Sequence, residues 1–149
     1  MRPLYDLPGH LVRRLQQVTQ NIYESEAKSF GVTHAQFAIL QTVQLMPGLE
    51  QREIAAAAGY DSVTASHIIR KLETMKMLRR DKGSRSRRGH SLHLTAAGAE
   101  KLEQMLPALT RVQERVIERL PADKRDLFLE LLSEIAGVEN SYWNSAAQK

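Results

Sequence analysis

The sequence contains no cysteine and no long apolar run. Without cysteine, the chain has no disulfide framework, no thiolate metal ligand and no thiol redox sensor. No apolar run approaches the roughly 18 residues that a membrane-spanning helix needs. Pro3, Asp6 and Pro8 occupy the region in which a signal peptide would carry its apolar segment. We therefore expect a soluble, cytoplasmic protein without a membrane partner.

The sequence also lacks the short motifs of common catalytic sites. It has no glycine-rich phosphate loop, no His-Glu-x-x-His pair and no Gly-x-Ser-x-Gly elbow. Its histidines are scattered, and the nearest two, His90 and His93, are three positions apart on a probable strand and so face opposite sides. We expect no enzymatic activity and no metal or other cofactor.

Charge is concentrated in one window of the chain. The formal net charge is +4, and residues 76–90 alone carry +6, because they contain seven basic residues and the single acidic residue Asp81. The other 134 residues sum to −2. A run of this kind is either a solvated surface loop or an anion-binding segment, and its neighbours in the sequence must decide between them.

Helical spacing of apolar residues predicts a long first helix over about residues 7–30. Pro8 suits its first turn, and its apolar positions recur at intervals of three and four residues, at Leu11, Leu15, Val18 and Ile22. Thr33 and Gln36 then have the spacing of a capping box. They predict a second helix, which stops before Pro47.

Residues 51–77 have the pattern of a helix, a tight turn and a second helix. An alanine-rich helix over 51–58 would end at Gly59, and Asp61 or Ser62 would cap the next helix. We expect the two helices to pack through Ile54, Val63, Ile68, Ile69 and Leu72. The opposite face of the second helix offers Ser62, Thr64, Ser66, His67 and Arg70.

The basic window follows this second helix and has the pattern of a β-hairpin. Leu78 to Asp81 and Ser91 to Leu94 are strand-like, and glycines at 83 and 89 mark a turn between them. Beyond the hairpin, Thr95 would cap a helix with apolar residues at Leu102, Met105, Leu109, Val112, Val116 and Leu120. A last helix would carry Leu127, Leu131, Ile135 and Val138. The predicted fold is mainly α with a small two-stranded β-wing.

A polar helix face directly followed by a basic hairpin points to DNA. Short polar side chains can approach base edges in the major groove, and arginines on a narrow ribbon can neutralise phosphates or enter the minor groove. The candidate DNA-contact residues are Ser62, Thr64, Ala65, Ser66, His67 and Arg70 on the helix and Arg85, Arg87 and Arg88 on the wing.

Two stretches of the sequence resemble MarR-family transcriptional regulators. They run from Asp61 to Asp81 and from Ser86 to Gly98, and their most specific elements are Leu72-Glu73, Arg87-Arg88 and Leu94-Thr95. The chain departs from the family pattern in two places. Ser86 stands where many members have an acidic residue, so the wing tip is either looser or held by Asp81. Glu50 stands where a Ser or Thr cap often opens the third helix.

The resemblance implies one domain over residues 1–149 that forms a homodimer. Dimerisation helices at about 7–30 and 96–145 would flank a winged helix-turn-helix lobe at about 33–95. The broad apolar stripes on the outer helices favour a dimer independently, although these helices could also pack within one chain. A dimer predicts a pseudo-palindromic operator in double-stranded DNA, with half-sites about one helical turn apart.

The resemblance also implies a small aromatic carboxylate or phenol as effector. Such a ligand needs an apolar slot and a cationic or hydrogen-bonding group, for which the candidates are Arg14, Phe37, Gln41 and His67. Phe37 could instead belong to the core, and His67 could contact DNA, contact the ligand or pack against backbone. The segment from Leu7 to Leu15 is similar to regulators of aromatic-acid catabolism, including nicotinate-degradation repressors.

The sequence therefore predicts a sequence-specific transcriptional regulator, a repressor that an aromatic acid or phenol releases from its operator. One alternative is a non-specific nucleic-acid or chromosome-architectural protein that depends on the basic wing alone. Another is a partner-binding module that uses the same fold without DNA.

Overall fold

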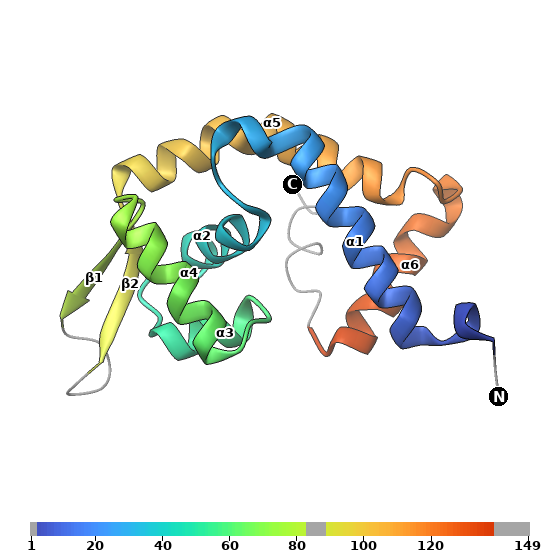
Figure 1. The fold of residues 1–149 in the computed structure, drawn as a ribbon, viewed down its shortest axis with the longest axis horizontal. Helices are drawn as coiled ribbons and strands as arrows, with labels where there is room; N and C mark the ends of the chain where they lie inside the picture. The colour runs from blue at the N-terminus through green and yellow to red at the C-terminus, as the bar shows by residue number, and fades with distance from the viewer. Residues whose placement is uncertain (1–2, 83–88, 139–149) are drawn as a thin grey trace. The chain divides into compact units, whose positions relative to one another are not determined.

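The structure is a computed structural model that describes residues 3–82 and 89–138. Its elements are η1 (Leu4–Asp6), α1 (Pro8–Ala27), η2 (Lys28–Phe30), α2 (His34–Leu45), α3 (Gln51–Ala57), α4 (Ser62–Thr74), β1 (Leu78–Lys82), β2 (His90–Leu94), α5 (Ala96–Ile117) and α6 (Ala122–Ala136) (Figure 1). The predicted fold class, mainly α with a two-stranded wing, is confirmed. Within the described ranges, no helix combines the length and apolar character needed to cross a bilayer.

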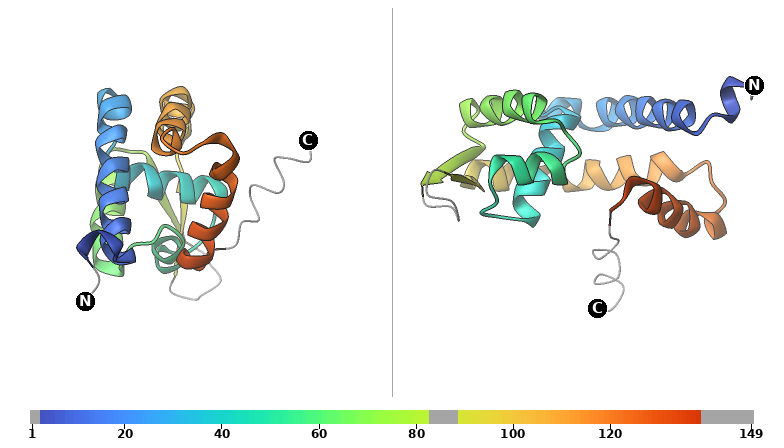
Figure 2. Two further views of the ribbon diagram at one scale, coloured as in Figure 1. Left: turned by 90° about the vertical axis from the view of Figure 1, so that its right-hand side faces the viewer. Right: turned by 90° about the horizontal axis from the view of Figure 1, so that it is seen from below.

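The chain divides into two compact units, Met1–Val112 and Gln113–Lys149. The first unit contains α1, the helix-turn-helix and the wing, and the second contains the end of α5 and α6. The boundary falls inside α5, so the two units share one continuous helix. The right-hand view of Figure 2 shows α3 and α4 of the first unit side by side.

Local hydrogen bonds fix the starts of α2 and α3. The Thr33 hydroxyl accepts from the Gln36 backbone N–H at 3.2 Å, and the Gln36 side chain accepts from the Thr33 N–H at 2.9 Å, as the capping-box spacing predicts. At α3 the Glu53 carboxylate accepts from the Glu50 N–H at 2.9 Å. The helix therefore starts at Gln51 as predicted, although Glu50 replaces the usual Ser or Thr.

The turn between α3 and α4 depends on one glycine and one aspartate. Gly59 has φ +76°, a conformation that favours glycine, and the N–H of Tyr60 bonds to the Ala55 carbonyl at 2.9 Å across it. Asp61, rather than Ser62, caps α4, because its carboxylate accepts from the Thr64 N–H at 2.8 Å. The sequence did not decide between Asp61 and Ser62 as the cap of α4, and the structure shows that the cap is Asp61.

The core of the first unit joins α2, α3, α4, the wing and α5. Its fully buried side chains include Ile39, Leu40, Val43, Ile54, Ile69, Leu72, Leu92 and Met105. Three of the five residues predicted to pack the helix-turn-helix, Ile54, Ile69 and Leu72, are among them. Ile68 is half-buried. Val63 was misplaced by the sequence analysis, since its side chain is 69% exposed on the far side of α4.

The wing is an antiparallel pair in which Leu78 faces Leu94 and Lys82 faces His90. A third segment, between α2 and α3, joins it. The Gly48 N–H donates to the Leu92 carbonyl at 3.2 Å, and the Leu92 N–H donates to the Leu49 carbonyl at 3.0 Å. The strand β2 is therefore hydrogen-bonded to the segment between α2 and α3 as well as to β1.

Thr95 and Gly98 hold the first turn of α5 against the loop that follows α4. The Thr95 hydroxyl accepts from the Gly98 N–H at 3.0 Å, which confirms the predicted cap. The same hydroxyl donates to the Lys76 carbonyl at 2.6 Å, and the Thr95 N–H donates to the Met77 carbonyl at 3.1 Å. A Cβ on Gly98 would overlap the Met77 carbonyl oxygen. This close approach requires glycine at position 98.

The C-terminal helices differ from each other in burial. Leu102, Met105, Leu109 and Val112 on α5 are buried, whereas α5 ends at Ile117, so Leu120 lies beyond the helix in which it was predicted. On α6 no residue is buried, and three of its large apolar side chains are about half exposed or more: Leu127, Leu131 and Ile135.

Gly98→Ala should lower the free energy of unfolding by about 2 kcal/mol, because the new methyl group would overlap the backbone oxygen of Met77. The hydrogen bonds from Thr95 to the Lys76 and Met77 carbonyls hold the start of α5 against this turn. Urea unfolding measures the change. The matched control is Gly9→Ala on α1, where a Cβ meets no atom within 4 Å and alanine is the better helix former. Equal stability of the Gly98→Ala variant and the wild type would contradict the close contact.

Candidate nucleic-acid interface

The exposed face of α4 consists of Ser62, Val63, Thr64, His67 and Arg70. Residues 63, 67 and 70 follow one another at intervals of four and three, so they lie on one stripe of the helix. Ala65, Ile69 and Leu72 form the opposite stripe and are completely buried. α4 therefore presents a continuous face of polar, cationic and small apolar side chains to solvent.

Two of the helix residues predicted to contact DNA are not on this face. The prediction that Ala65 contacts DNA is corrected, because its side chain is 0% exposed and packs in the core. Ser66 is half-buried at the edge of the face. Thr64 is exposed, but its hydroxyl donates to the Asp61 carboxylate at 2.7 Å. A base contact by Thr64 would therefore use the remaining acceptor capacity of the hydroxyl or its methyl group.

Asp61 is ionised more readily than an ordinary aspartate. Hydrogen bonds from the Thr64 backbone and then from the Thr64 hydroxyl lower the pKa of its carboxyl from the usual 3.8. A carboxylate at this position also interacts favourably with the positive end of the α4 dipole. The N-terminus of α4 is thus held by one charged cap.

The wing base is fixed to both helices of the helix-turn-helix. Arg80 on β1 donates from Nε to Glu73 of α4 at 2.7 Å and from Nη2 to Gln51 of α3 at 2.9 Å. Neighbouring Asp81 accepts from Arg79, and the Nε2 atom of His93 lies 3.7 Å from the same carboxylate. Glu73, which the sequence analysis noted only as part of a pattern, is the residue that orients Arg80.

The three wing arginines predicted to contact DNA, Arg85, Arg87 and Arg88, lie outside the described residues, as does Ser86. Asp81, which was considered as a partner for the wing tip, accepts a hydrogen bond from Arg79 in the described part.

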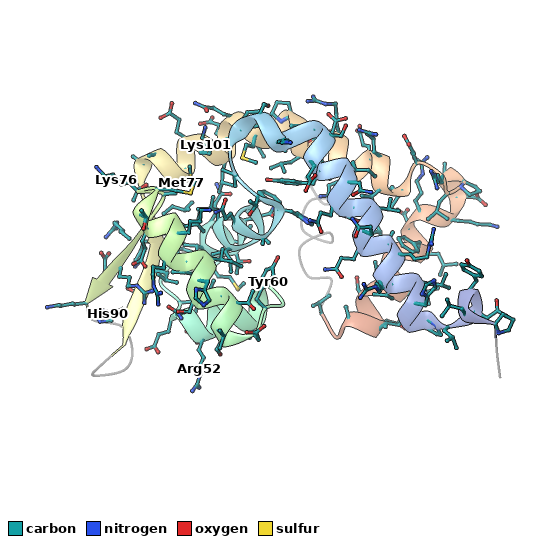
Figure 3. All side chains as sticks on the ribbon, in the orientation of Figure 1. Arg52, Tyr60, Lys76, Met77, His90 and Lys101 are labelled. Atoms are coloured by element: carbon teal, nitrogen blue, oxygen red, sulfur yellow. The ribbon has the colours of Figure 1, made fainter. Side chains whose placement is uncertain are left out.

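The turn from α4 to β1 contains a lysine in the left-handed conformation. Lys76 has φ 57°, its N–H donates to the Glu73 carbonyl at 2.9 Å, and the Met77 N–H donates to the Leu72 carbonyl at 2.9 Å. This is the hydrogen-bond pattern of a helix end that normally uses glycine. A side chain at this φ costs about 1 kcal/mol, so the surrounding contacts must hold Lys76 in place. Figure 3 labels Lys76 and Met77 at this junction.

The predicted effector residues are not gathered around one pocket. Arg14 is exposed and lines a hollow formed by α1 residues alone, namely His10, Arg13, Arg14, Gln16, Gln17 and Gln20. Gln41 is exposed on α2. The prediction that Phe37 lines an open ligand slot is corrected, because its side chain is only 6% exposed and its ring centroid lies 6.0 Å from that of Tyr23.

His67 is exposed on α4, so it is not the packed histidine that was one of its three interpretations. Contact with DNA and contact with a ligand both stay open to it. Nearer the core, burial raises the pKa of Tyr23 to about 12, and the Tyr23 hydroxyl donates to the Val32 carbonyl at 2.9 Å. Tyr23 is therefore a neutral structural residue between α1 and α2.

A short helix, a glycine turn, an exposed second helix and an antiparallel hairpin define a winged helix-turn-helix protein. The MarR family model matches residues 32–90, which include α2, α3, α4 and β1.

Relatives extend the match over most of the chain. HosA, a transcriptional regulator of Escherichia coli, is 27% identical over 123 residues, which cover 83% of this chain and 90% of HosA. The transcriptional repressor CouR, solved on a 23-mer DNA duplex, is 30% identical with a TM-score of 0.80. This match covers 89% of this chain and 94% of the CouR chain. PcaV of Streptomyces coelicolor, solved with its natural ligand, is 26% identical with a TM-score of 0.79, covering 92% and 96%. The chain belongs to the MarR family of transcriptional regulators.

The lowered pKa of Asp61 predicts a specific pH dependence. Because the folded-state pKa lies below the unfolded one, the ionised cap stabilises the fold above about pH 4, and this contribution disappears as the pH falls through the folded-state value. Asp61→Asn retains a capping oxygen but cannot ionise, so its urea midpoint should change less between pH 5 and pH 3 than that of the wild type. The same fall in both proteins, or an Asp61 pKa above 3.8 by NMR titration, would refute the account.

Proposed function

We propose that this chain is a sequence-specific repressor that binds a pseudo-palindromic operator in double-stranded DNA as a homodimer. The observation that carries the proposal is the exposed face of α4, which Arg80 and the Lys76 turn hold in a fixed relation to the wing base. A helix and a ribbon fixed in this way can occupy adjacent grooves of one duplex. The relative CouR, solved on a DNA duplex, supports the same use of the fold.

Each residue on the exposed face of α4 suits a particular contact. Arg70 can donate two hydrogen bonds to a guanine edge, and Ser62 can bond to a base or a phosphate. Val63, which the sequence analysis placed in the core, would supply an apolar contact for a thymine methyl group. On the wing, Arg85, Arg87 and Arg88 would neutralise phosphates or enter the minor groove.

Exposed apolar side chains support the homodimer. In a single chain, Leu11 and Val12 of α1 are about half exposed. Leu127, Leu131 and Ile135 of α6 are also exposed, and no residue of α6 is buried. Exposed apolar side chains on helices of a regulator favour association with a second copy. Two copies present two α4 helices, which is why we propose an operator with two half-sites about one helical turn apart.

We further propose that a small aromatic carboxylate or phenol releases the repressor from its operator. Arg14 and its neighbour Arg13 line one hollow on α1 and could hold a carboxylate there. PcaV, a relative solved with its natural ligand, supports the existence of an effector but does not identify it for this chain. Hydroxylated pyridine and benzene carboxylates are the first compounds to test.

Selection of bound fragments from the source genome should return a small set of duplexes with a common two-fold symmetric sequence. Fluorescence anisotropy should then give at least about 1,000-fold tighter binding to that sequence than to a random duplex, with an affinity that falls steeply as salt rises. Arg70→Ala should weaken operator binding by about 10- to 100-fold, as expected for a lost base contact.

The control for Arg70→Ala is Lys101→Ala, which also removes one positive charge. Lys101 lies on α5, and Figure 3 shows it on the opposite side of the first unit from Arg52. Equal, sequence-independent binding by the wild type to every duplex would favour an architectural protein. Unchanged DNA affinity after joint replacement of Arg87 and Arg88 by alanine would favour a partner-binding module.

The effector prediction concerns release, not binding to DNA. At least one hydroxylated aromatic carboxylate should weaken operator binding by about 5- to 150-fold, the usual range for coupled sites. Arg14→Ala should abolish this response and leave the operator affinity of the free protein unchanged, because Arg14 is on α1 and not on α4. An undiminished response in the Arg14→Ala variant would remove Arg14 from the effector site.

A further inference from the structure

A polar hollow lies beside the exposed face of α4, between the start of α3, the start of α4 and the two strands of the wing. It is lined by Glu50, Gln51, Arg52, Ser62, Arg80 and His90. Of these residues, only Ser62 was a DNA-contact candidate. Four elements, α3, α4, β1 and β2, therefore bring cationic or hydrogen-bonding side chains to one place that the sequence analysis did not identify.

The cations around the hollow are not equivalent. Arg80 lines the hollow, and its guanidinium donates to Glu73 and Gln51, of which the Glu73 carboxylate offsets part of its charge. Arg52 and His90 are exposed, and neither forms an ion pair with another residue in the described part of the chain. Figure 3 shows Arg52 extending from α3 into solvent and His90 on the wing. Arg52 is thus the cation most available to an incoming anion.

We propose that this hollow binds one backbone phosphate of the operator in each half-site, with Arg52 as its principal ligand and Ser62 and His90 beside it. The inference rests on the proposed function, because it requires α4 to lie in the major groove. A helix inserted by its N-terminal end brings the phosphates that border the groove close to that end. Ser62, the first residue of α4, belongs both to that end and to the hollow.

Glu50 is the acidic residue that lines the hollow, and it is engaged in the cap of α3. Its side chain accepts from the Glu53 backbone N–H, and its own backbone N–H donates to the side chain of Glu53. The proposed phosphate contact therefore depends on Arg52 and not on Glu50.

The test measures binding to the selected operator and to a random duplex of equal length at several salt concentrations. Arg52→Ala should weaken both affinities by about 5- to 10-fold and reduce the salt dependence by about one ion per protomer, whereas Arg52→Lys should retain most of the affinity. Lys101→Ala, the matched control, should change neither by more than about 2-fold.

Operators with one neutral methylphosphonate at successive positions locate the contact. One position per half-site should weaken binding by the wild type but not by the Arg52→Ala variant, because that variant has already lost the contact. If the wild type binds its operator tightly and Arg52→Ala binds as tightly, or is sensitive to the same positions, the inference is wrong and the proposed function stands. If the wild type shows no preference for the selected operator, the proposed function itself fails.

Discussion

The end of α4, the start of β1 and the first turn of α5 meet where the Thr95 hydroxyl donates to the Lys76 carbonyl. Lys76 stands in a left-handed conformation that its side chain disfavours, and Gly98 lets α5 approach the Met77 carbonyl closely. Neither feature is stable alone. The left-handed turn depends on the two Thr95 hydrogen bonds, and the helix start depends on the turn that accepts them. The direction of the wing relative to α4 follows from this junction.

Two further connections make the winged lobe one unit. Arg80 joins the wing to α3 and α4 through Gln51 and Glu73, and residues 48 and 49 join β2 to the segment after α2. Because α2 ends at Leu45, shortly before that segment, the covalent chain and two backbone hydrogen bonds link the end of α2 to β2. Arg80 also lines the polar hollow next to Ser62 of α4, so the position of the hollow depends on the same contact.

The sequence predicted those parts of the fold that local chemistry determines. The Thr33 capping box, the Gly59 turn and the Thr95 cap are each encoded within four residues, and all three are confirmed. The sequence analysis placed Val63 in the core and Ala65 on the DNA-contact face, and the structure shows Val63 exposed and Ala65 buried. The spacing of Ala65 with Ile69 and Leu72 already indicated the buried stripe. Hydrophobicity was weighted above helical phase at these two positions.

Contacts between distant residues left no such signal. Arg80 and Gln51 are 29 positions apart, and nothing in either neighbourhood indicates that they are bonded. The hollow combines residues from α3, α4, β1 and β2, so it follows only from the tertiary arrangement. For the same reason the effector residues were chosen by resemblance and by the chemistry that such a ligand needs, and of the two roles considered for Phe37 the structure shows the core position.

Methylation interference on the selected operator tests the central claim most directly, because a methyl group on guanine N7 occupies the floor of the major groove. The account predicts that such methyl groups weaken binding in two blocks, one per half-site, whose centres are about one helical turn apart. Tight, specific binding without interference at any guanine of an operator that has guanines in both half-sites would contradict it, since α4 would then not lie in the major groove.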